Sequence, residues 1–327
     1  MRILVYIVSS VRAWNIPDRH VAQLREGFPD VEFVHARTHA EAVDGIAAAT
    51  VAFASYVSAE MLGATRGLQW IHAPAAGVGH MLSRELAAST VIMTNSRGFN
   101  ADSMAEHVLA MILAVKRQIP AAVRLQHRHH WGQNDLHSSE RMLLVKGQHV
   151  GVFGLGKIGS RVADLAAAFG ARVSACRRHV DRGAPPSVTE LRPSEDLAAW
   201  LPDLDILVIA APQTPETEGL FGRRELLLMK RSALLVNVSR GPLVRESELI
   251  EELRRGTIGA AALDVFEEEP LDAVSPLWDM PNVLITPHVG GLRPDYWDLA
   301  ADFFAENLRR FRSGQPLMNV VDKGAGY

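Results

Sequence analysis

Short apolar runs alternate with stretches of helical pattern through the first third of the chain. The helical stretches, of which residues 39–48 are one example, fall between the apolar runs. The predicted strands are residues 3–8, 31–35, 51–56, 68–72 and 91–94. Strands that alternate with helices in this way are typical of a parallel sheet covered by helices on both faces.

A second series of the same kind occupies residues 149–288. Its predicted strands are residues 149–153, 171–176, 206–211, 233–238, 260–263 and 283–286; its predicted helices are residues 157–169, 194–201, 223–230 and 246–255; and residues 181–193 are predicted to form a loop. A long helix from Ser103 to about Ile119 joins the two series; Pro120 interrupts the helical pattern, and a second helix is expected to continue to His130. A last helix, residues 294–311, is expected to start with Pro294 at its first position and to return to the first domain.

These patterns predict an α/β fold with two doubly wound parallel-sheet domains. One domain is expected to comprise residues 1–98 plus 290–327, and the other residues 99–289. A length of 327 residues agrees with about two domains. The apolar residues near Met1 precede no small-residue cleavage site, so they are interpreted as a first strand.

Composition narrows the class of protein. A net charge of −3 gives no broad positive field for nucleic acid or an anionic membrane. No apolar run approaches the ~20 residues of a transmembrane helix. The single cysteine, Cys176, excludes an intrachain disulfide and suits a reducing compartment, so a cytoplasmic location is expected.

The most informative stretch is His149-Val-Gly-Val-Phe-Gly-Leu-Gly-Lys-Ile-Gly-Ser160. It places Gly154, Gly156 and Gly159, a G-x-G-x-x-G pattern, between a predicted strand and a predicted helix. The first glycine permits a tight turn, the second lets the backbone approach a pyrophosphate, and the third lets helix and strand pack closely. The helix N-terminus offers free N–H groups to phosphate oxygens. This stretch predicts a dinucleotide-binding site in a Rossmann domain.

Four charged residues follow strands of the second series, where ligands bind in open α/β sheets: Arg240, Asp264, Glu269 and His288. Taken singly, each has a structural explanation, since Arg240 can be a surface arginine, residues 267–269 a solvated acidic run and His288 a structural histidine. In the first series, the small residues 75–79 follow a strand and expose backbone N–H groups.

Five ordered motifs resemble those of the NAD(P)-dependent, D-isomer-specific 2-hydroxyacid dehydrogenases. They are GLGKIG at 154–159, PQTPET at 212–217, VNVSRGPLV at 236–244, ALDVFEEEP at 262–270 and TPHVGG at 286–291. Family-like sequence covers nearly the whole chain, including AAGV at 75–78 and AEHVLAMILAVKRQIP at 105–120. SPLWDMPNVLITPH, RPDYW and the final Gly-Tyr resemble the glyoxylate/hydroxypyruvate reductase branch.

The resemblance implies a flavodoxin-like substrate domain, a Rossmann coenzyme domain and a homodimer. It implies reduction of a small 2-oxo acid to a D-2-hydroxy acid, with Arg240, Glu269 and His288 as the catalytic set. His288 would donate the proton, Glu269 would keep His288 charged, and Arg240 would hold the substrate carboxylate. The N–H groups of Ala76 and Gly77 would bind the same substrate. The expected cofactor contacts are Gly154, Leu155, Gly156, Lys157, Ile158, Gly159, Arg177, Arg178, Pro212, Thr217, Val238 and Asp264, the last at the nicotinamide amide.

The sequence departs from the NAD pattern after the second strand of this domain. An acidic residue there normally binds the ribose 2′-hydroxyl, whereas this chain has Arg177 followed by Arg178. Two arginines would attract a 2′-phosphate, so NADP(H) is predicted to be preferred over NAD(H). A second departure is Arg293, which could face a distal group of the substrate but is interpreted as a structural residue. The run His127–His130 lacks the acidic partners of a metal site, and no metal is expected.

Two other functions are compatible with the same fold. One is an NAD(P)H-sensing, corepressor-like binding protein without significant turnover, and the other is a formate- or phosphonate-oxidising enzyme. The chain has no obvious long insertion of the formate-oxidising kind. Turnover of glyoxylate or hydroxypyruvate with NADPH would separate a reductase from a sensor.

Overall fold

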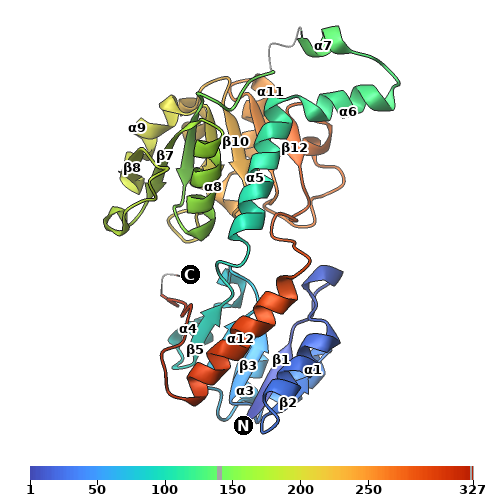
Figure 1. The fold of residues 1–327 in the computed structure, drawn as a ribbon, viewed down its shortest axis with the longest axis vertical. Helices are drawn as coiled ribbons and strands as arrows, with labels where there is room; N and C mark the ends of the chain where they lie inside the picture. Colours follow the sequence, from blue (N-terminus) through green and yellow to red (C-terminus); the bar gives the residue numbers. More distant parts are fainter. Residues whose placement is uncertain (138–141, 325, 327) are drawn as a thin grey trace. The chain divides into compact units, whose positions relative to one another are not determined.

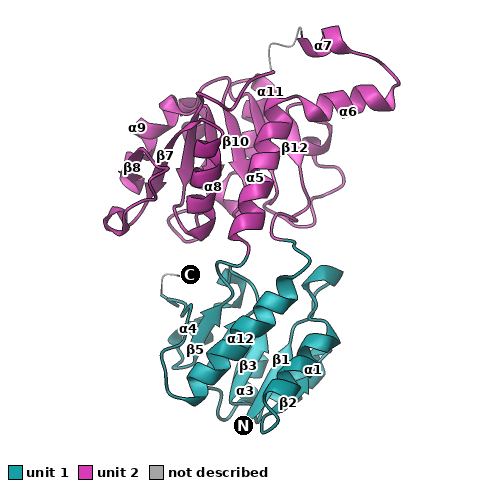
Figure 2. Cartoon of the chain, viewed as in Figure 1, with its two compact units in different colours: residues 1–99, 292–327 teal, residues 100–291 magenta. Residues whose placement is uncertain are grey.

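The computed structural model describes residues 1–137, 142–324 and 326, and the chain forms two compact units. Unit 1 comprises residues 1–99 and 292–327, and unit 2 comprises residues 100–291 (Figure 2). Each unit is built on one parallel sheet (Figure 1).

Unit 1 contains a parallel sheet of five strands in the order β2-β1-β3-β4-β5, which is the flavodoxin-like order. The strands are β1 (Arg2–Tyr6), β2 (Glu32–His35), β3 (Val51–Ala54), β4 (Trp70–Ala73) and β5 (Ile92–Asn95). The helices are α1 (Asp18–Gly27), α2 (His39–Ile46), α3 (Ala59–Ala64), α4 (Arg84–Ala88) and α12 (Tyr296–Arg312). Short 3-10 turns occupy Arg12–Trp14 and Gly79–Met81.

Helices cover both faces of this sheet, and the alternation of side chains along the strands explains why. Ile3 and Val5 of β1 pack on one face with α1 and α12, whereas Leu4 packs on the other face with α2, α3 and α4. On the first face, the Phe304 ring of α12 stacks on Phe53, with ring centroids 4.4 Å apart. The last helix of the chain therefore belongs to the core of unit 1.

Unit 2 contains a parallel sheet of seven strands in the order β12-β11-β10-β9-β6-β7-β8. The strands are β6 (His149–Phe153), β7 (Arg172–Arg177), β8 (Glu190–Pro193), β9 (Ile206–Ile209), β10 (Leu234–Asn237), β11 (Ala260–Leu263) and β12 (Val283–Ile285). The helices are α5 (Ala101–Lys116), α6 (Ile119–His127), α7 (Gln133–His137), α8 (Lys157–Ala168), α9 (Leu197–Trp200), α10 (Arg223–Leu228) and α11 (Glu246–Arg255). Counted from β6, this is the Rossmann order with one further strand, β12, at an edge.

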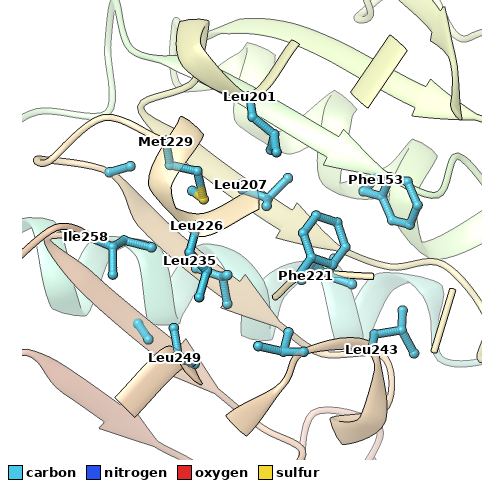
Figure 3. Close-up of a cluster of buried hydrophobic side chains, with 14 of the residues drawn as sticks. Phe153, Leu201, Leu207, Phe221, Leu226, Met229, Leu235, Leu243, Leu249 and Ile258 are labelled. Atoms are coloured by element: carbon cyan, nitrogen blue, oxygen red, sulfur yellow. The ribbon is translucent and has the colours of Figure 1, made fainter. Parts of the chain in front are cut away.

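Two hydrophobic clusters fill the faces of the second sheet. The cluster in Figure 3 packs Leu207 and Leu235 against Phe221, Leu226 of α10 and Leu249 of α11. The other cluster packs the opposite side of the strands against α5 and α8. The central strands are thus buried on both faces, which accounts for their nearly continuous apolar sequences. The predicted fold class is confirmed in both units.

Three local predictions are corrected by the structure. The predicted loop 181–193 ends in the edge strand β8, whose sequence ELRP lacks an apolar run because it pairs on one side only. The long helix breaks at Gln118, which has a left-handed φ of 57°, and Pro120 lies in the first turn of α6, where its missing N–H costs no hydrogen bond. Pro294 precedes the N-cap Asp295 rather than starting the last helix.

Candidate active site

The glycine turn after β6 has the close packing that a dinucleotide cradle requires. Gly154 has a φ of 97°, and a Cβ there would lie 2.4 Å from the Ala211 nitrogen. A Cβ on Gly159 would lie 2.1 Å from the Gly154 carbonyl oxygen. In contrast, a Cβ on Gly156, the N-cap of α8, would meet no described atom within 4 Å. The turn is therefore tight against the protein and open at the helix N-terminus, which fits a bound pyrophosphate.

The other expected cofactor residues lie around the carboxyl ends of neighbouring strands. Leu155 and Val238 are buried in the hydrophobic cluster that includes α5 and α8, so only their backbone can face a ligand. Lys157 is exposed in the first turn of α8, and Ile158 beside it is half-buried. In the loop after β9, the Thr217 hydroxyl donates to the Pro212 carbonyl at 2.7 Å and thereby closes the loop.

Arg177 and Arg178 stand at the end of β7, where the sequence placed them. The Arg177 guanidinium donates to the Gly183 carbonyl at 3.1 Å on the surface of unit 2. The Arg178 side chain, also exposed, lies 3.9 Å from the Glu216 carboxylate. Neither arginine is locked into a buried ion pair, so both guanidinium groups can turn towards an anion.

The loop after β12 presents His288. Its imidazole Nδ1 lies 2.6 Å from Oε2 of Glu269, and both side chains are partly exposed. His288 has a φ of 53°, in the left-handed region that is uncommon for a residue with a side chain. Its N–H donates to the carbonyls of Asp264 and Thr286, at 2.9 and 3.0 Å, and these bonds hold the strained backbone in place. The geometry leaves Nε2 of His288 as the ring nitrogen directed away from Glu269.

The electrostatics of the pair favour an ionised Glu269. Burial alone would raise the pKa of Glu269, but hydrogen bonds from His288 and the Phe266 N–H, with the charges of His288 and Arg240, outweigh it. The pKa of Glu269 therefore lies below its usual range. Burial lowers the pKa of the Arg240 guanidinium, and the charge of Glu269 opposes that effect. Arg240, Glu269 and His288 thus form one electrostatically coupled group.

Gly241 explains how the loops that carry Arg240 and Glu269 come together. A Cβ on Gly241 would lie 1.8 Å from the backbone of Phe266, so no other residue fits without moving one of the loops. The Asn237 amide fixes the loop from inside, since its Nδ2 donates to the Arg240 carbonyl at 3.0 Å. Glycine is therefore required by packing at position 241 of the motif at 236–244.

Asp264 anchors the loop of His288. Its carboxylate is buried and accepts hydrogen bonds from the Thr286 hydroxyl at 2.6 Å and from the N–H groups of Val289 and Gly290, each at 3.0 Å. Burial would raise the pKa of Asp264, but these bonds and one from His107 keep it below its usual value. In this structure the carboxylate faces its own loop, whereas the expected contact with a nicotinamide amide stays a prediction.

Sequence reasoning missed His107 and Thr286. Nε2 of His107, on α5, lies 3.0 Å from Oγ1 of Thr286 and 3.3 Å from Oδ1 of Asp264. The available signal was a histidine within the largely apolar run of this helix, next to Val108 and three residues after Met104. A polar side chain on a core-facing helix needs a buried partner, and the buried carboxylate of Asp264 is that partner.

The remaining predicted residues lie in unit 1. Ala76 is exposed and Gly77 half-buried in the loop that follows β4. Arg293 makes a two-pronged ion pair with Asp295, at 2.6 and 2.7 Å, and donates to the Phe99 carbonyl at 2.8 Å. These contacts agree with a structural role for Arg293 before α12.

No group of three or more His, Cys, Asp or Glu side chains is arranged to hold a metal ion in the part of the chain that the structure describes. Among the described helices, none combines the length and the apolarity needed to cross a bilayer.

Comparison with known proteins identifies the family. Residues 109–290 match the sequence pattern described as "D-isomer specific 2-hydroxyacid dehydrogenase, NAD binding domain". The chain is 38% identical over 237 residues to the glyoxylate reductase of Aeropyrum pernix, covering 71% of this chain and 70% of that protein. It is 36% identical over 275 residues to the D-3-phosphoglycerate dehydrogenase of Mycobacterium tuberculosis, covering 84% of this chain and 50% of that protein. The chain thus spans half the length of this dehydrogenase.

Solved structures with the same architecture agree. A D-isomer specific 2-hydroxyacid dehydrogenase from Xanthobacter autotrophicus, in complex with NADPH and MES, is 31% identical with a TM-score of 0.84, and the match covers 100% of this chain and 99% of that one. An NADPH-dependent glyoxylate/hydroxypyruvate reductase from Sinorhizobium meliloti, in complex with NADP and sulfate, is 28% identical with a TM-score of 0.83 and the same coverage. This chain belongs to the family of NAD(P)-dependent, D-isomer-specific 2-hydroxyacid dehydrogenases.

Proposed function

We propose that this protein is an NADPH-preferring reductase that converts small 2-oxo acids, of the glyoxylate and hydroxypyruvate kind, to D-2-hydroxy acids. The observation that carries the proposal is the 2.6 Å contact between His288 and Glu269, next to the half-buried Arg240. An imidazole paired with a carboxylate is a general acid, and a guanidinium suits a carboxylate substrate. In this proposal unit 2 binds the cofactor, and unit 1 is the substrate domain.

The residues would divide the work as follows. When bound, NADPH supplies the hydride that reaches the carbonyl carbon of the substrate. Nε2 of His288 would donate a proton to the carbonyl oxygen, and Glu269 would stabilise the imidazolium through Nδ1. Arg240 would hold the substrate carboxylate and polarise the carbonyl, and the N–H groups of Ala76 and Gly77 would bind the same anion.

The experiment is a screen of 2-oxo acids with the purified protein, following the loss of NADPH absorbance. Glyoxylate, hydroxypyruvate, pyruvate and 3-phosphohydroxypyruvate form the panel, since relatives include a glyoxylate reductase and phosphoglycerate dehydrogenases. We expect turnover of the smaller unphosphorylated acids and a D-configured product from hydroxypyruvate. Tight NADPH binding without any turnover would contradict the proposal and favour a corepressor-like sensor.

We also propose that Arg177 and Arg178 select NADPH. Charge-assisted hydrogen bonds to the 2′-phosphate are worth roughly 1.5–3 kcal/mol, and each ~1.4 kcal/mol is tenfold. The expected preference in kcat/KM is therefore on the order of ten- to a hundredfold. Arg177→Asp should weaken NADPH much more than NADH, whereas Arg66→Asp, the same charge change at an exposed site of unit 1, should alter neither. Equal kcat/KM values for the two cofactors in the parent protein would contradict this preference.

Exposed apolar side chains support the dimer that the resemblance implies. The helix α6 buries no residue, and it extends with α7 away from the sheet of unit 2 (Figure 1). The Trp131 side chain between the two helices is 90% exposed, and Leu144 beyond them is 63% exposed. We propose that a second copy of the chain covers this segment. Light scattering should give the mass of a dimer for the parent protein and a smaller mass for Trp131→Arg.

A further inference from the structure

Three consecutive carbonyls of the loop after β4 are fastened by hydrogen bonds from other parts of unit 1. The carbonyls of Pro74, Ala75 and Ala76 accept from the Tyr296 hydroxyl, from the Ser96 N–H at 3.3 Å and from Nδ2 of Asn95 at 2.7 Å, respectively. In the part of the chain that the structure describes, the N–H groups of Ala75, Ala76 and Gly77 donate to no protein acceptor.

The planarity of the peptide bond links these two facts. In a trans peptide, the carbonyl of one residue and the N–H of the next lie in one plane and point in opposite directions. A donor that holds the Ala76 carbonyl therefore also sets the direction of the Gly77 N–H. The same argument links the Ala75 carbonyl to the Ala76 N–H. The loop thus presents a row of oriented N–H groups, the arrangement with which backbones bind anions.

Asn95 is the side chain best placed to exert this control. It is 1% exposed at the end of β5, and its hydrogen bonds distinguish the two possible orientations of the side-chain amide. Nδ2 donates to the Ala76 carbonyl, while Oδ1 accepts from the Arg97 N–H at 3.4 Å. Its backbone is held as well, because the Asn319 side chain donates to the Asn95 carbonyl at 3.1 Å and the Asn95 N–H donates to the Asn319 carbonyl at 3.2 Å.

We propose that Asn95 is a positioning residue for substrate binding, which holds the Ala76–Gly77 peptide so that the Gly77 N–H faces the carboxylate of the 2-oxo acid. Tyr296 acts in the same way, more weakly, two peptide planes earlier, because its hydroxyl holds the Pro74 carbonyl and thereby orients the Ala75 N–H. The proposal rests on the proposed function in one respect, namely that the bound anion is the substrate. An N–H that is oriented in advance binds an anion without the cost of ordering the peptide.

The test compares Asn95→Leu with Thr94→Val. Both change a buried polar residue of β5, but Thr94 bonds Trp70 and His72 and does not touch the loop. We expect Asn95→Leu to raise the KM for glyoxylate and the inhibition constant of oxalate by about tenfold, the scale of one hydrogen bond. Its kcat should fall less than about threefold, and its dissociation constant for NADPH should not change. Thr94→Val should lower the thermal midpoint without raising either anion constant.

Tyr296→Phe provides a second variant that keeps the ring packing and removes one donor. It should raise the same two anion constants by about threefold. An unchanged oxalate constant in both Asn95→Leu and Tyr296→Phe would overturn the proposal, as would an equal rise in Thr94→Val. The proposed function fails separately: if the parent protein binds oxalate but reduces no 2-oxo acid, weaker oxalate binding by Asn95→Leu still supports the positioning role. A parent protein that neither reduces glyoxylate nor binds oxalate would overturn both.

Discussion

Two loops that carry predicted site residues, one in each unit, are held by hydrogen bonds to opposite sides of their backbones. In unit 2, the loop after β12 is held by its N–H groups, because the Asp264 carboxylate accepts from Val289 and Gly290. In unit 1, the loop after β4 is held by its carbonyls, to one of which Asn95 donates. The group that the loop after β12 can present to a ligand is the His288 side chain, whereas the loop after β4 can present backbone N–H groups. The loop of unit 2 thus presents a side chain, and the loop of unit 1 presents backbone N–H groups.

The comparison predicts its largest effect at His288. Because this loop offers a side chain, His288→Ala should lower kcat by about 10²–10⁴-fold, the usual contribution of a general acid. The loop of unit 1 offers only its backbone, so Ala76→Ser, at an exposed position, should change kcat and KM by less than about threefold. Steady-state kinetics with glyoxylate and NADPH check both variants. A loss in Ala76→Ser as large as that in His288→Ala would contradict the distinction between the loops.

The next largest effect is expected from the anchor of the first loop. Asp264→Asn replaces a carboxylate, which only accepts hydrogen bonds, by an amide. The amide NH2 would face one of the two N–H donors, and that N–H would lose its acceptor. The free energy of unfolding should therefore fall by about 3 kcal/mol. The kcat should fall as well, because His288 loses its fixed position. Asp279→Asn, an exposed aspartate of unit 2, should change the free energy of unfolding by less than about 0.5 kcal/mol. Urea denaturation measures both variants.

The pH dependence of this effect has a definite sign. The pKa of Asp264 is below its ordinary value, against the effect of burial, because Thr286, His107 and two N–H groups stabilise the ionised form. A carboxyl with a depressed pKa in the folded state contributes stability above its unfolded pKa, about 3.9, and loses it as the pH falls through the folded value. The stability difference between the parent and Asp264→Asn should therefore be constant near neutral pH and shrink below about pH 4.

Much of the candidate site could be predicted from the sequence, but the hydrogen bonds that hold its loops could not. The glycine turn and the positions of Arg240, Glu269 and His288 follow from local motifs at strand ends, which short-range pattern encodes. His107 lies 179 residues before its partner Thr286, so the link depends on how α5 packs on the sheet rather than on any local pattern. For the same reason β8 was missed, since a short polar edge strand is specified by its neighbour more than by its own residues.

A smaller effect should appear in the pH profile of Glu269→Gln. The pKa of Glu269 is below its usual value despite burial, so the side chain is ionised at neutral pH and supports a protonated His288. Reduction needs that proton and is lost as the pH rises. Without the carboxylate, the alkaline limb of the kcat profile should move to lower pH, and the move should be small because both side chains are partly exposed and solvent screens the pair. A limb that stays in place would point to Glu267 or Glu268 as the partner.

The smallest predicted effect gives the finest test of the comparison. Thr286→Val removes one of the donors to Asp264 and keeps the shape of the side chain. We expect a loss of about 1 kcal/mol in the free energy of unfolding, the net contribution of one hydrogen bond, because Asp264 keeps the bonds from the Val289 and Gly290 N–H groups. The kcat should fall about threefold with an unchanged KM, because only the loop that carries His288 is loosened.

Combining Thr286→Val with Asn95→Leu tests whether the two loops are held independently. That variant is expected to raise KM and leave kcat nearly unchanged, because the loop that it loosens presents N–H groups to the substrate carboxylate. If each loop is fastened within its own unit, the double variant Asn95→Leu with Thr286→Val should show the product of the two separate changes. A combined change much larger or smaller than that product would mean that the two loops share an anchor, and that unit 1 and unit 2 do not hold their loops separately.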